Sequence, residues 1–135
     1  MPYAIGIVLA LAVSVYATAL RLDRDRAFYP TVLVVIASYY VLFGVMGGSD
    51  RAVIVESLVM GVFVVAASLG FRRSLWLVVV ALAGHGVLDF FHARVVANPG
   101  VPVWWPAFCL AYDVAAAGYL AWRLTRDQIP RVAAA

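Results

Sequence analysis

The sequence predicts an all-α, polytopic integral membrane protein, a bundle of five transmembrane helices that forms a single membrane domain over residues 1–135. Three observations predict this class. Hydrophobic residues make up 66% of the 135 residues and charged residues only 13%, whereas a soluble domain carries about 25% charged residues. The mean hydropathy is +0.99. Long apolar runs, separated by short charged links, follow one another along the chain.

Each apolar run is close to the roughly 20 residues that cross a bilayer as a helix. The predicted spans cover residues 3–20, 28–46, 52–71, 75–96 and 103–122. Pro30 and Pro106 fall in the first turns of the second and fifth spans, where a missing backbone amide breaks no helical hydrogen bond. The links are short, so we expect consecutive helices to be antiparallel neighbours.

The arginines predict how the spans are oriented. Five spans put the two termini on opposite sides of the membrane. The arginines expected on one side are Arg21, Arg24, Arg26, Arg72, Arg73, Arg123, Arg126 and Arg131. The other side has only Arg51 and Arg94. Because arginine accumulates in cytoplasmic loops, we expect the N-terminus outside and the C-terminus in the cytoplasm.

The composition also restricts the cellular location and the binding partners that we expect for the protein. An Ala-, Val- and Arg-rich chain without lysine indicates a bacterial origin, so a multi-pass protein of the bacterial inner membrane is expected. The absence of lysine excludes a retinal or pyridoxal Schiff base. No basic run indicates nucleic acid binding. The expected partners are the lipid bilayer, a lipophilic small molecule and, because the chain is short, further copies of the same chain.

Three acids and both histidines fall within the predicted spans. They are Glu56, His85, Asp89, His92 and Asp113, while the other four acids fall in links or tails. An ionisable side chain at mid-bilayer costs about 2.5 to 3.5 kcal/mol, and such residues usually face the bundle interior and serve a function. A functional site is therefore predicted.

The spacing of these residues predicts their geometry. His85, Asp89 and His92 stand at positions i, i+4 and i+7, within an arc of roughly 60 degrees on one helix face. Counting about 1.5 Å per residue places the three acids and both histidines in the outer half of the membrane. Three tyrosines are expected to support them with hydrogen bonds, namely Tyr39, Tyr40 and Tyr112.

Imidazole and carboxylate groups from facing helices are suitable ligands for zinc, iron or manganese. We therefore expect a divalent metal ion on His85, Asp89 and His92, with Glu56 or Asp113 completing the shell or serving as general base. Cys109, one turn before Asp113, is interpreted as a packing residue that could act as a soft ligand. The predicted function is a membrane-embedded, metal-assisted enzyme acting on a lipophilic substrate.

Three alternatives remain open at this point. The same residues suit a metal-free acid and base catalyst, such as a lipid isomerase. They also suit the relay of a small proton- or ion-coupled transporter or channel. Finally, they could simply hold the helices together through hydrogen bonds.

Overall fold

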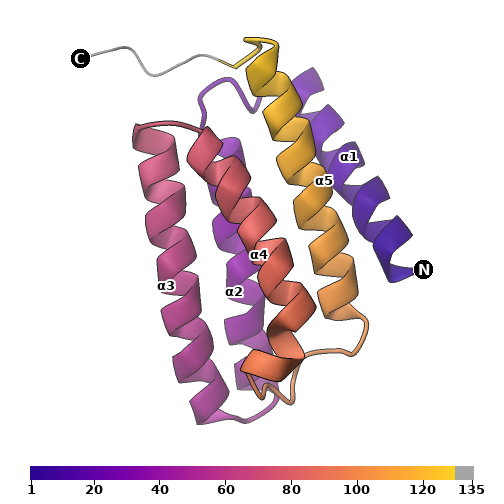
Figure 1. The fold of residues 1–135 in the computed structure, drawn as a ribbon, viewed down its shortest axis with the longest axis vertical. Coiled ribbons are helices and arrows are strands. Elements are labelled where there is room, and N and C mark those ends of the chain that lie inside the picture. Colours follow the sequence, from indigo (N-terminus) through magenta and orange to yellow (C-terminus); the bar gives the residue numbers. More distant parts are fainter. Residues whose placement is uncertain (130–135) are drawn as a thin grey trace.

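The computed structural model describes residues 1–129, which contain five helices and no strand. The helices are α1 (Pro2–Ala19), α2 (Phe28–Met46), α3 (Asp50–Arg72), α4 (Trp76–Val95) and α5 (Trp105–Thr125), as Figure 1 shows. The predicted all-α class is therefore confirmed. Each predicted span agrees with its helix to within three residues at either end.

Four of the helices, α1 to α4, are long and apolar enough to cross a membrane. α5, which carries Asp113 and Arg123 among its apolar residues, is not one of the four. Valine, leucine and isoleucine side chains on the outside of the bundle are exposed, as at Val8, Ile54 and Leu58. These features support a membrane protein, while the fifth crossing and the orientation stay predictions.

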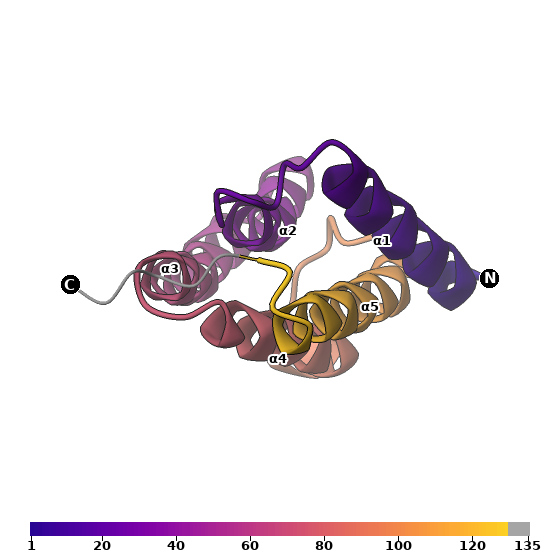
Figure 2. The same ribbon diagram turned by 90° about the horizontal axis from the view of Figure 1, so that it is seen from above.

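The helices pack in an order that differs from their order in the chain. α1 lies against α5, α5 against α4, α4 against α3, and α3 against α2. α1 and α2 are consecutive in the sequence but stand apart, as the view from above shows (Figure 2). Gly6 permits the close packing of α1 on α5, because a Cβ atom there would collide with the carbonyl oxygen of Phe108.

The connections lie at two opposite ends of the bundle (Figure 1). We call the end with connections 20–27 and 73–75 the arginine end, and the end with connections 47–49 and 96–104 the site end. The arginine end carries Arg21, Arg24, Arg26, Arg72, Arg73, Arg123 and Arg126. Arg131, which the predicted orientation also counts, lies outside the described residues.

Both ends of α3 are capped by side chains. Ser49 accepts a hydrogen bond from the backbone amide of Ala52 at 3.2 Å, which satisfies one of the free amides of the first turn. At the other end, the Arg26 guanidinium donates to the carbonyl oxygens of Gly70 at 3.3 Å and Phe71 at 3.2 Å. These caps fix the register of α3 and with it the position of Glu56.

Candidate metal centre

Four side chains that can bind a metal ion meet where α4 packs against α5. His85 and Asp89 are one turn apart on α4, and Cys109 and Asp113 are one turn apart on α5. One ligand atom from each lies within 4.8 Å of the other three. All four residues are at most 2% exposed. We call these four residues the α4–α5 cluster.

A glycine lets the two helices approach at the level of the cluster. A Cβ atom at Gly86 would lie 3.3 Å from the carbonyl oxygen and 3.3 Å from the Cδ1 atom of Leu110. Such a contact is tighter than most side chains tolerate. The residue next to His85 therefore allows α5 to bring Cys109 and Asp113 within reach of α4.

Hydrogen bonds orient three members of the cluster. The Nδ1 atom of His85 lies 2.7 Å from Oδ2 of Asp113 and 3.4 Å from Oδ2 of Asp89. The hydroxyl of Tyr40 donates to Oδ1 of Asp89 at 2.6 Å. One oxygen of each carboxyl group thus faces the same imidazole nitrogen, and α2 holds Asp89 in that orientation.

The α4–α5 cluster is rich in acceptors and poor in positive charge. Oδ2 of Asp89 and Oδ1 of Asp113 are buried and have no well-formed hydrogen bond to any residue between 1 and 129. Within the same range, no arginine pairs with either carboxyl group. Two buried carboxyl groups this close together require a shared proton or a cation. The cluster therefore has the charge of a site that could hold a metal ion.

A second pair of titratable residues lies beside the cluster. Nε2 of His92 is 2.8 Å from Oε1 of Glu56, and both side chains are buried. The amide of Asn98 donates to the same glutamate oxygen at 3.1 Å and to the carbonyl oxygen of Tyr40 at 3.0 Å. The Tyr40 ring stacks on the His92 ring with centroids 4.1 Å apart. Tyr40 therefore contacts both the Glu56–His92 pair and the α4–α5 cluster.

The structure brings together some of the residues expected to share a site and separates others. His85, Asp89 and Asp113 lie together, whereas His92 faces Glu56 and is not in the group that could hold a metal ion. Tyr40 makes a hydrogen bond of the kind expected of it. The hydroxyls of Tyr39 and Tyr112 make no hydrogen bond within residues 1–129, and both residues line a groove beside the cluster.

Two residues at the site end make contacts with the candidate site that their sequence context does not indicate. Asn98 stands in an Asn-Pro-Gly run that is typical of a turn, and nothing in this run signals a bond to Glu56. Cys109 is interpreted from the sequence as a packing residue that could act as a soft ligand, and it lies in the group that could hold a metal ion. It precedes Asp113 by one turn, just as His85 precedes Asp89. The two helices therefore contribute matching pairs to the cluster.

A separate polar network is buried at the arginine end. Arg123 on α5 pairs with Oδ2 of Asp23 at 3.2 Å, and the hydroxyl of Thr18 donates to the same oxygen at 3.1 Å. The hydroxyls of Thr18 and Tyr119 lie 3.2 Å apart. Asp23 is only 1% exposed although it stands in a charged link between two spans. We call Thr18, Asp23, Tyr119 and Arg123 the arginine-end network.

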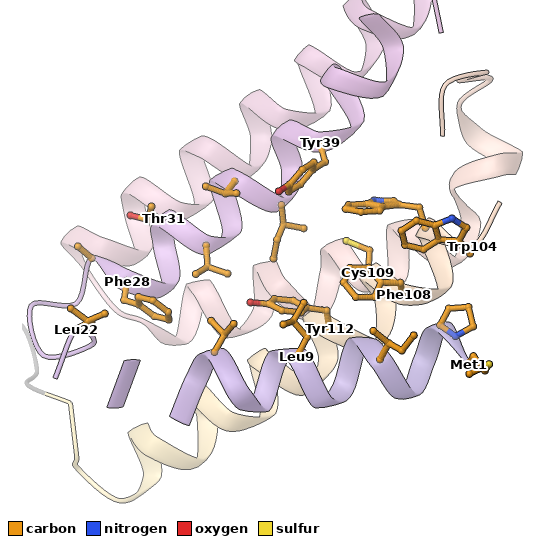
Figure 3. Close-up of a pocket in the computed structure, with 18 of the residues that line it drawn as sticks. Met1, Leu9, Leu22, Phe28, Thr31, Tyr39, Trp104, Phe108, Cys109 and Tyr112 are labelled. Carbon is orange, nitrogen blue, oxygen red and sulfur yellow. The ribbon is translucent and has the colours of Figure 1, made fainter. Parts of the chain in front are cut away.

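An apolar groove opens beside the cluster, in the space between α1, α2 and α5. Its volume is about 990 Å³. Tyr39, Phe108, Cys109 and Tyr112 lie along it (Figure 3). Cys109 belongs both to the groove and to the α4–α5 cluster, so the groove reaches the candidate metal centre through this residue.

Comparison with known proteins identifies no relative: no protein family matches the chain, no curated protein is similar to it, and no solved structure matches its fold. The chemistry of the site is therefore inferred from its own residues. The relevant features are the four converging ligand atoms, the absence of an arginine partner within residues 1–129, and the adjoining groove.

Proposed function

We propose that the protein is a membrane-embedded enzyme that holds a divalent metal ion in the α4–α5 cluster and acts on a lipophilic substrate. The observation that carries the proposal is the convergence of four buried ligand atoms, each within 4.8 Å of the others. Imidazole, thiolate and carboxylate are all zinc ligands, and iron and manganese also accept imidazole and carboxylate.

The proposed ligand set is His85, Asp89, Cys109 and Asp113. It differs from the set expected from spacing alone, because His92 is engaged by Glu56. In this proposal the Glu56–His92 pair supports the site from outside, through Tyr40 and Asn98. Groups that orient metal ligands in this way are integral to the affinity of metal sites.

A bound metal ion would polarise a substrate carbonyl or favour ionisation of a water molecule. Catalytic sites commonly use three protein ligands and leave one position open, so one of the two carboxyl ligands would leave the metal ion when the substrate binds and act as general base. Asp89 suits this role because Tyr40 holds its Oδ1 atom while its Oδ2 atom faces the cluster. Asp113, bonded to His85, orients the imidazole.

In this proposal, all five helices cross the bacterial inner membrane, with the site end outside and the arginine end in the cytoplasm. The support is the arginine distribution, since Arg51 and Arg94 are the only arginines toward the site end within residues 1–129. The candidate metal centre then lies in the outer half of the bilayer. A lipophilic substrate would reach it from the membrane.

The test is metal analysis of the purified full chain by inductively coupled plasma mass spectrometry, after supplementation with zinc, iron or manganese. His85→Ala and His92→Ala form a matched pair, because both histidines lie on α4 and are at most 2% exposed. We expect one metal ion per wild-type chain, loss of the metal in His85→Ala, and retention in His92→Ala.

Two other outcomes of the metal analysis would contradict the proposal. A metal-free wild-type protein would refute metal assistance and leave acid and base catalysis as the remaining enzymatic role. Equal loss of metal in both variants would refute the different roles proposed for His85 as a ligand and His92 as a supporting residue. Circular dichroism in detergent confirms in each case that the variant is folded.

A second candidate function, proton or ion transport, is favoured by one observation. Buried polar residues occur at both ends of the bundle, in the α4–α5 cluster and in the arginine-end network. A relay would use both groups. Proton flux in liposomes tests it: a flux that Asp113→Asn and Asp23→Asn both abolish would favour transport over catalysis.

A further inference from the structure

The groove between α1, α2 and α5 extends along most of α1. Met1 and Trp104 mark one end, and Leu22 and Phe28 mark the other (Figure 3). Aliphatic and aromatic side chains dominate its walls, among them Leu9, Val35 and Phe108. Its volume of about 990 Å³ is at the upper end of the range of roughly 300 to 1,000 Å³ for ligand pockets.

The apolar walls of the groove, which run along α1 and α2, fit one or two extended hydrocarbon chains, because flexible methylene groups adapt to an irregular apolar surface.

The charges along the groove favour a neutral ligand. Among the described residues that line it, Asp25 at the arginine end is the only one with a charged side chain. No arginine lines it within residues 1–129. An anionic headgroup drawn into the groove would find the Asp25 carboxylate and no cationic side chain among residues 1–129 to offset its lost hydration.

The site end of the groove supplies polar groups for one end of such a ligand. The indole nitrogen of Trp105 is buried and has no hydrogen-bond partner among residues 1–129. Trp105 lines the groove together with Cys109 and with Tyr39 and Tyr112, whose hydroxyls also lack hydrogen bonds in that range. A buried N–H group without a partner is costly, so a rotation of the Trp105 ring that turns this N–H group toward an oxygen atom of a ligand would be favourable.

We propose that the groove binds a neutral, long-chain lipid with a hydroxyl or carbonyl group, such as a fatty alcohol, aldehyde or ester. The hydrocarbon chain lies toward Phe28, and the oxygen-bearing end lies beside Trp105 and Cys109. Cys109 then connects the ligand to the α4–α5 cluster. This inference names the substrate class of the proposed enzyme, and the ligand's role as a substrate rests on that proposed function.

The probe that tests it is a long-chain primary alcohol carrying a diazirine in mid-chain, photolysed with the full-length protein in detergent. Labelled peptides are identified by mass spectrometry. We expect labels on α1 and α2 residues of the groove. Unlabelled fatty alcohol should compete, while the fatty acid anion and phosphatidylglycerol should compete weakly.

Two valines provide a matched control. Val35 lies in the groove and Val62 faces outward from α3, with exposed fractions of 47% and 67%. Val35→Trp fills the groove, so we expect labelling to fall by about tenfold or more, whereas Val62→Trp should leave labelling unchanged. Trp105→Phe should reduce the preference for the alcohol over a plain alkane probe.

Several results would overturn the inference. These are labels spread over the outer surface, equal effects of Val35→Trp and Val62→Trp, and equal competition by phosphatidylglycerol. A covalent dimer linked through the groove would show that a second copy occupies it, which would also overturn the inference.

Metal content measured on the same samples separates the two proposals. Metal bound without groove labelling would refute the lipid site alone. Groove labelling without metal would refute metal assistance and leave the lipid site standing.

Discussion

The bundle contains two buried polar groups whose difference lies in charge balance. In the arginine-end network, Asp23 is paired with Arg123 at 3.2 Å and is also bonded to Thr18. In the α4–α5 cluster, two carboxyl groups share one imidazole nitrogen. The charges of Asp23 and Arg123 cancel in the arginine-end network. In the α4–α5 cluster, two ionised carboxyl groups would face at most one positive charge, that of His85. A buried carboxylate that is paired with a cation contributes to holding the fold together, because removing one partner leaves the other charge buried alone. A buried carboxylate without a cation is available to bind a cationic ligand.

The position of each group in the fold agrees with this distinction. The arginine-end network joins α1, the link after it, and α5. The α4–α5 cluster lies on two helices that already pack closely through Gly86. Apolar residues that are fully buried, including Leu33, Leu82 and Leu120, form the core of the bundle. Under the proposed function, stability and chemistry thus depend on different residues.

The largest expected effect is on stability, and it distinguishes two single variants that each remove one acid, from the arginine-end network or from the α4–α5 cluster. Asp23→Ala leaves Arg123 without its carboxylate and should cost about 3 to 5 kcal/mol in the free energy of unfolding. Asp113→Ala removes one of two neighbouring carboxyl groups and one hydrogen bond, so about 1 kcal/mol is expected. Equilibrium unfolding in mixed detergent micelles measures both, and equal losses would contradict the comparison.

The next effect concerns two buried tyrosines on α2, Tyr29 and Tyr40, each 2% exposed. Tyr40→Phe removes the hydroxyl that donates to Asp89, so the proposed metal affinity should fall about 10- to 100-fold. Tyr29→Phe, outside the cluster, should leave the affinity unchanged. Titration with zinc, followed by calorimetry, checks this prediction. A loss of affinity in both variants would indicate a general packing effect.

A smaller, selective effect is expected from Cys109→Ser. The thiol is the soft ligand of the α4–α5 cluster, and a hydroxyl is a harder and weaker one. Zinc affinity should therefore fall by more than manganese affinity does. Competition between the two ions, read by metal analysis, measures the ratio. An unchanged ratio would exclude Cys109 from the ligand set.

The smallest effects concern single hydrogen-bonding side chains in the two regions. Asn98→Ala removes bonds to Glu56 and Tyr40, and Thr18→Val removes bonds to Asp23 and Tyr119. Each should lower the free energy of unfolding by about 1 to 2 kcal/mol. Only Asn98→Ala should also weaken metal binding, since it alone adjoins the site. A similar loss of metal affinity in Thr18→Val would contradict the separation of the two regions.

The sequence predicts the helices well because their signal is local. An apolar run bounded by charge marks a span whatever its neighbours are, and the five runs match the five helices. The helical period likewise predicts that His85 and Asp89 share a face, and residue counting places Asp113 at the same depth. These three residues do lie together in the structure.

The sequence cannot assign partners, because these depend on which helices touch. Spacing puts His92 on the same face as His85, yet α3 presents Glu56 to His92 while α5 presents Asp113 to His85. The burial of Asp23 within a charged link likewise depends on Arg123, which is 100 residues away in the chain.

The sequence by itself determined the all-α class, the extent of the helices and the acids and histidines that lie within the apolar runs, since composition and period are properties of single segments. Only the tertiary structure decided that Cys109 joins the cluster, that Asn98 holds Glu56, and that a groove separates α1 from α2. The physical reason is that helix packing depends on close contacts such as those at Gly6 and Gly86, which join residues distant in the chain.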